Sequence, residues 1–123
     1  MNFDNIPLRV PNVEKVKKQF EIFINDFKNA KTCLEALQIL KKVFKYEDNL
    51  VTELTVISIR FSVNTLDKKI ANANNKADEI SPIISDICND FNLELLNSPF
   101  KNELENKLGK YYFDILEVNK KIF

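Results

Sequence analysis

The sequence contains no histidine. Imidazole is the commonest general base and the commonest zinc ligand in proteins, and the serine hydrolase triad depends on it. An HExxH zinc motif is therefore impossible here, and the two cysteines are too far apart in the sequence to form a CxxC pair. We expect no catalytic residue, no cofactor-binding residue and no metal ligand in this chain.

Glycine and proline are also scarce, with one glycine and four prolines among 123 residues. A phosphate-binding loop needs several glycines, all-β folds need frequent turn residues, and α/β folds usually need glycine in their loops. The composition therefore favours long helices.

The chain carries no net charge, because eighteen basic residues balance eighteen acidic ones. No basic field exists to attract a phosphate backbone. No apolar run approaches the ~20 residues that span a bilayer, and the N-terminus lacks the features of a secretory signal. We expect no nucleic-acid partner, no membrane partner and a cytoplasmic location.

The remaining reactive side chains have ordinary structural interpretations. Cys33 and Cys88 fall on apolar or boundary positions of helices, which indicates buried free thiols rather than a disulfide. Adjacent carboxylates such as Glu47 and Asp48 point in different directions on a helix, so we interpret them as solvated surface residues rather than an acid–base pair.

Apolar residues recur at steps of three and four, the spacing that places side chains on one face of a helix. Phenylalanines dominate this pattern, and we interpret Phe20, Phe23, Phe27, Phe44 and Phe91 as core residues. Thr32 and Glu35 form a capping-box pattern at the start of a second helix. The prediction is an all-α fold of three or four long, mainly antiparallel helices, at about 11–30, 32–64, 67–97 and 99–122.

Proline positions refine these boundaries. Pro82 lies inside the third helix and predicts a kink or a restart at Ser81, which could cap the restarted helix. Ser98 is placed to cap the fourth helix, with Pro99 at its first position. We expect that helix to continue through Gly109 as a tolerated weak point.

The two ends of the chain differ in their patterns. Prolines 7 and 11 predict an extended arm over residues 1–10, followed by a single helical domain over residues 11–123. The helical pattern is still open at Phe123, which favours an N-terminal fragment of a larger protein.

Residues 55–63, TVISIRFSV, alternate as a half-buried strand would. We nevertheless expect a helix there, because no partner strand exists elsewhere and a lone strand leaves its backbone groups unbonded. Arg60, one of two arginines, interrupts this apolar run. It is the candidate for an internal ion pair or an interdomain contact, and the plainer alternative is that it extends to solvent.

Four segments in this order resemble the beginning of oligoendopeptidase F-type zinc metallopeptidases, relatives of thimet oligopeptidase. They are residues 6–12 (IPLRVPN), 27–32 (FKNAKT), 58–67 (SIRFSVNTLD) and 98–105 (SPFKNELE), followed by Leu108 and Gly109. None of them carries chemistry, and they are spread along the chain from residue 6 to residue 109, so the resemblance extends over nearly its whole length.

The resemblance implies that these helices form a scaffold and part of the wall of a channel that admits short peptides. In that family zinc is held by an HExxH helix and a further glutamate later in the chain, and neither has a counterpart here. The catalytic remainder in cis would be the partner, and no peptidase activity is expected from this chain alone. The alternative is a standalone helical interaction module or homo-oligomer that associates through an exposed apolar face.

Overall fold

The computed structural model describes residues 8–109 and 113–115, which form helices and connecting segments without a strand. The four main helices are α1 (Val13–Lys28), α2 (Cys33–Val63), α3 (Lys68–Leu96) and α4 (Lys101–Leu108). Residues 113–115 form a further short helical segment. The all-α prediction is confirmed, and each end of the first three helices lies within two residues of its expected position.

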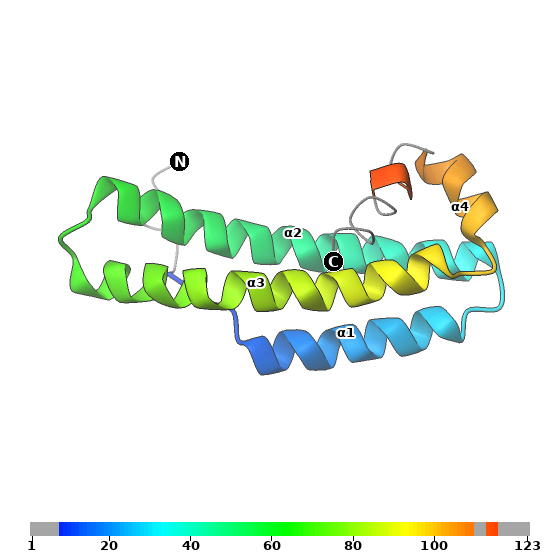
Figure 1. Cartoon of the computed structure of the whole chain (residues 1–123), viewed down its shortest axis with the longest axis horizontal. Coiled ribbons are helices and arrows are strands. Elements are labelled where there is room, and N and C mark those ends of the chain that lie inside the picture. Colours follow the sequence, from blue (N-terminus) through cyan, green and yellow to red (C-terminus); the bar gives the residue numbers. More distant parts are fainter. Residues whose placement is uncertain (1–7, 110–112, 116–123) are drawn as a thin grey trace.

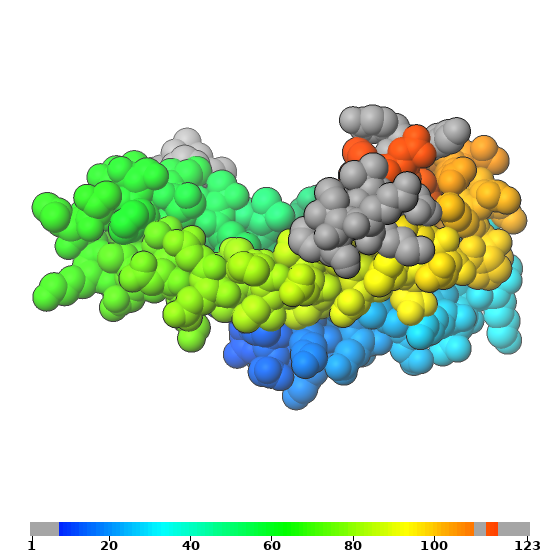
Figure 2. Space-filling view, viewed as in Figure 1, coloured from blue at the N-terminus to red at the C-terminus, as the bar shows by residue number. Residues whose placement is uncertain are grey.

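The helices α2 and α3 form a long hairpin, and consecutive helices reverse direction from α1 to α3 (Figure 1). α1 packs mainly against α3 and also touches α2, while α4 contacts α2. α1 is much shorter than the hairpin, so the end where α2 turns into α3 projects beyond it (Figure 2, green). The predicted antiparallel order of successive helices is confirmed for these three.

Side-chain caps define where α2 and α3 begin. Oγ1 of Thr32 accepts a hydrogen bond from the Glu35 amide at 3.1 Å, and Oε2 of Glu35 accepts one from the Lys31 amide at 2.8 Å. The predicted capping box is present, with Lys31 as the second donor. At α3, Oδ1 of Asp67 accepts from the amide of Ile70 at 3.2 Å. Both caps satisfy amides that lack a partner in the first helical turn.

The strand-like segment 55–63 is helical throughout, as expected. Val56 and Ile57 are adjacent and both buried, an arrangement that a two-residue alternation does not produce. Oγ of Ser62 donates to the Ser58 carbonyl at 3.0 Å, so this hydroxyl is bonded within the helix.

Of the two alternatives predicted near Pro82, a kink or a restart at Ser81, the restart does not occur. α3 is one continuous helix from Lys68 to Leu96 with Pro82 inside it. Oγ of Ser81 donates to the Ala77 carbonyl at 2.7 Å and therefore does not cap a new helix. The apolar stripe on both sides of Pro82 is buried, and this packing keeps the helix together across the proline.

The fourth helix is shorter than predicted. It starts after Phe100, and Ser98 caps no helix but accepts a bond from the Phe100 amide at 3.1 Å within the preceding turn. Pro99 lies in that turn rather than at the first helical position. Gly109 ends the helix at a φ of 95°, a conformation that favours glycine. The expected continuation as one helix is wrong at Gly109, and most of the later residues lie outside the described part.

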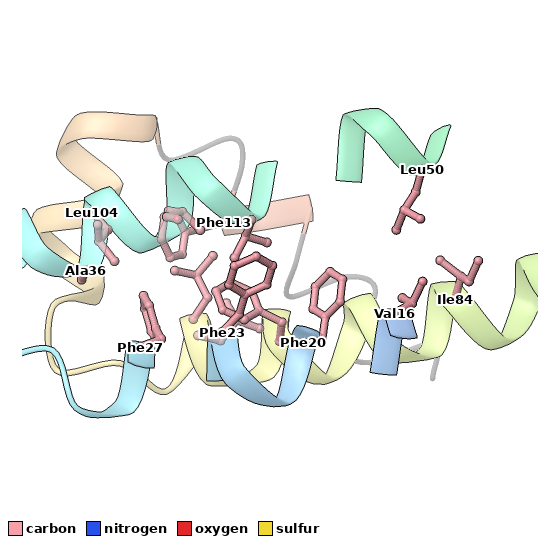
Figure 3. Packing of buried hydrophobic residues seen from close by; sticks show 14 of the residues in the cluster. Val16, Phe20, Phe23, Phe27, Ala36, Leu50, Ile84, Leu104 and Phe113 are labelled. Atoms are coloured by element: carbon pink, nitrogen blue, oxygen red, sulfur yellow. The ribbon is translucent and has the colours of Figure 1, made fainter. Parts of the chain in front are cut away.

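The main core lies between α1, α2 and α3 and also takes in Leu104 and Phe113 (Figure 3). Phe91 meets the ring of Phe27 edge to face at a centroid distance of 5.4 Å and that of Phe20 at 6.4 Å. Such pairs add to the stabilisation from burial. The core interpretation of the phenylalanines is confirmed, although Phe44 is only half-buried.

A second, smaller core lies within the hairpin, where Ile57 packs with Ala73 and Ala77. Leu8 and Val10 cover it from the N-terminal segment. The arm over residues 1–10 and the domain over 11–123 remain predictions, because residues 1–7 lie outside the described part of the chain.

Candidate functional site

A zinc site is not formed by the residues that the structure describes. Over 8–109 and 113–115, no three side chains of histidine, cysteine, aspartate or glutamate gather closely enough to hold a metal ion. Both cysteines are free thiols, as predicted. Since the whole sequence also lacks histidine, these residues do not fit the zinc chemistry of the resembled family.

Arg60 lies in the last turn of α2, and its side chain is half-buried. The Asn64 amide bonds to its carbonyl at 2.9 Å and closes the helix there. A positive charge at this position interacts favourably with the carbonyl end of the helix. The structure therefore gives Arg60 a local role as well, and its interdomain contact remains a prediction.

The end of α2 and the connection to α3 expose large apolar side chains shortly after Arg60 in the sequence. Val63 is 80% exposed and Leu66 is 92% exposed, the two highest values among the large apolar residues described. We call residues 59–67 the hairpin tip. Its exposed apolar surface is a candidate for contact with another part of a protein.

A second candidate is a groove between the middle parts of α2 and α3, with a volume of about 290 Å³. Leu50, Val51, Leu54 and Ile84 supply its apolar walls, and no residue of α1 lines it. We call it the α2–α3 groove. Of these walls Val51 is 61% exposed, whereas Leu50 and Ile84 are buried at 7% and 6%.

Glu47 lines this groove together with Cys88. Burial raises the pKa of the Glu47 carboxyl to about 7, with a further contribution from Asp48, and burial raises the pKa of the Cys88 thiol to about 12. The interpretation of Glu47 as a solvated residue is therefore wrong. Its spacing from Leu50 and Leu54 places it on the apolar face of α2, and this signal could have identified it.

None of the helices in the described part of the chain is both long enough and apolar enough to cross a membrane.

The sequence model of the Peptidase M3 N-terminal domain matches residues 3–123. The chain belongs to the Peptidase M3 N-terminal domain family. The predicted resemblance to the N-terminal region of oligoendopeptidase F-type enzymes is thereby confirmed.

Two solved structures extend this M3 assignment. A protein from Bacillus anthracis str. Ames, assigned as an oligoendopeptidase F, is 31% identical and superposes with a TM-score of 0.90 over 95% of this chain. PZ peptidase A, solved with an inhibitor, is 28% identical, with a TM-score of 0.89 over 94% of this chain. No curated protein matches the chain.

This chain, an M3 N-terminal domain, corresponds to only part of each relative. It spans 22% of the Bacillus anthracis chain and 21% of the PZ peptidase A chain. Most of each relative therefore lies outside the part that this chain resembles.

Proposed function

We propose that the chain is the non-catalytic N-terminal domain of a zinc-dependent oligopeptidase, where it serves as scaffold and as part of the wall of a peptide channel. The catalytic remainder of the enzyme, in cis, supplies the zinc site and the reacting groups. Short peptides enter the channel, and this domain helps to exclude folded proteins. The enzyme acts in the cytoplasm, in keeping with the two free cysteines.

One observation carries this proposal. The family model of the Peptidase M3 N-terminal domain matches residues 3–123, and nearly the same part of the chain superposes on about a fifth of the Bacillus anthracis oligoendopeptidase F relative. The described residues supply no metal-ligand group, so the chemistry has to come from the rest of such an enzyme.

A fused protein tests the proposal. Residues 1–123 replace the matching N-terminal part of the Bacillus anthracis relative, and cleavage of a quenched fluorescent peptide is measured with zinc present. We expect the fused protein to cleave the peptide, whereas the relative's remainder without any N-terminal part should lose most of its activity. A folded fused protein no more active than that truncated remainder would contradict the proposal.

Arg60 is proposed as a polar contact of this domain with the catalytic remainder. Arg60→Ala is then expected to lower the thermal unfolding midpoint of the fused protein more than that of the free chain. The other arginine, Arg9, is exposed, so Arg9→Ala is the matched control and should change neither midpoint. If Arg60→Ala lowers the unfolding midpoint of the fused protein and of the free chain equally, Arg60 acts only inside this domain.

A further inference from the structure

The charges on the hairpin are unevenly distributed. Residues 46–59 of α2 hold three acidic residues and no basic one, and residues 77–100, largely α3, hold five acidic residues and no basic one. All eighteen basic residues of the chain lie elsewhere. The α2–α3 groove lies between these two segments, so it lies in a part of the hairpin that holds no basic residue.

Among the residues that the structure describes, one salt bridge compensates these acidic residues. Glu94 pairs with Lys28 of α1 at 3.3 Å. The other seven form no salt bridge with any residue in the two described ranges. Glu47 is the acidic residue that lines the groove itself, and its carboxylate is half-buried. A partly desolvated carboxylate of this kind is stabilised when a cation is brought to it.

We propose that the α2–α3 groove binds an apolar segment that carries a lysine or arginine, supplied by the catalytic remainder of the peptidase, and that this cation pairs with Glu47. The inference rests on the proposed function and specifies one contact within it. The apolar side chains of the segment lie against Val51 and Leu54, and its cation reaches the carboxylate at the groove.

Charge complementarity selects this occupant over others. A neutral apolar segment would bury the Glu47 carboxylate further without a partner, and an acidic segment would be repelled by that carboxylate. A second copy of the chain bound through the same face in a symmetric dimer would bring two acidic surfaces together. A lysine- or arginine-bearing segment avoids both the unpaired buried carboxylate and the repulsion between negative charges.

The first test uses the free chain and two labelled peptides of equal length and helical spacing, one of leucine and lysine and the other of leucine and glutamate. Fluorescence anisotropy should show the lysine peptide binding at least about tenfold more tightly. Glu47→Gln should weaken that binding about fivefold or more. Glu21→Gln, on the exposed surface of α1, is the matched control and should have little effect. Equal losses in the two variants would show general attraction to acidic surface and overturn the inference.

The second test uses Cys88 as a reporter, because this thiol lines the groove while Cys33 is buried in the main core. Both thiols are labelled with a maleimide and quantified by peptide mass spectrometry, in the free chain and in the fused protein. An occupied groove should slow labelling of Cys88 at least about tenfold relative to Cys33 in the fused protein, since the reagent needs access to the thiol. Removal of the Glu47 charge by itself favours the reactive thiolate of Cys88, so Glu47→Gln should speed labelling of Cys88 in the fused protein by a larger factor than in the free chain.

The outcomes separate the two proposals. An active fused protein in which Cys88 reacts as fast as in the free chain would overturn the groove contact and leave the proposed function standing. A folded fused protein without peptidase activity would overturn the proposed function and this inference with it.

Discussion

Glu47 shows how burial changes a single side chain. Burial raises the pKa of its carboxyl from 4.5 to about 7, and Asp48 adds to the shift. In the unfolded chain the carboxyl regains its ordinary pKa. Between these values the folded protein binds the proton more strongly than the unfolded chain does. The free energy of unfolding should therefore fall as the pH rises through this window.

Glu47→Gln removes this titration. At about pH 8 the variant should be more stable than the parent by about 1–2 kcal/mol, because partial contact with water reduces the full effect of the shifted pKa. Near pH 4 the Glu47 carboxyl is largely protonated in both the folded and the unfolded parent. The difference in stability between variant and parent should therefore nearly vanish. Urea unfolding at several pH values measures it, with exposed Glu21→Gln as the control. If the difference in unfolding free energy between variant and parent does not change with pH, the raised pKa of Glu47 is contradicted.

At the scale of elements, α3 contains an energetic weak point that packing overcomes. Pro82 has no amide to donate to the carbonyl of Asp78, and its ring crowds that turn. The proline is exposed, while Ile80 and Ile84 on either side of it are buried in the main core. Burial of these side chains holds the helix across a position that local preference would break.

Pro82→Ala should therefore stabilise the chain by about 1–3 kcal/mol, since alanine restores the missing hydrogen bond and favours a helix. The gain is reduced by the larger conformational freedom of the unfolded variant. Thermal unfolding followed by circular dichroism measures it. Ile83→Ala, at the exposed neighbouring position, is the control and should change stability by much less. A destabilised Pro82→Ala variant would mean that the proline geometry is required.

At the scale of the whole molecule, α1 does not cover the hairpin tip, residues 59–67. α1 has 16 residues, against 31 in α2 and 29 in α3, so it cannot extend along the full hairpin. Val63 and Leu66 are consequently exposed at the projecting end. In the proposed enzyme, this surface is available to the catalytic remainder. In the free chain, it is available to solvent or to another copy.

Replacing both Val63 and Leu66 by serine should reduce binding of a hydrophobic dye and any self-association of the free chain, because the two side chains are the most exposed large apolar residues described. Dye fluorescence and sedimentation velocity measure the two effects. Ile22→Ser with Leu34→Ser, at exposed positions on α1 and α2, is the matched control. A parent chain that is strictly monomeric and binds no dye would remove the basis for an interaction surface here.

The sequence by itself determined the helices and the limits on chemistry. Three-four spacing places Phe20, Phe23 and Phe27 on one face of α1, and these side chains are buried as predicted. The lack of histidine excludes imidazole chemistry in any fold. The resemblance of short segments to oligoendopeptidase F-type enzymes also pointed to the family that the comparisons show.

Only the tertiary structure decided which helix faces stay open and where local rules fail. Gly109 ends α4 because the chain adopts a left-handed conformation there, which no spacing pattern reveals. Pro82 remains inside a helix because distant residues pack on both sides of it. Glu47 and Cys88 lie far apart in the sequence and share a groove only because α2 and α3 pack together. Burial and its effect on pKa depend on such long-range packing, and local patterns of residues do not contain it.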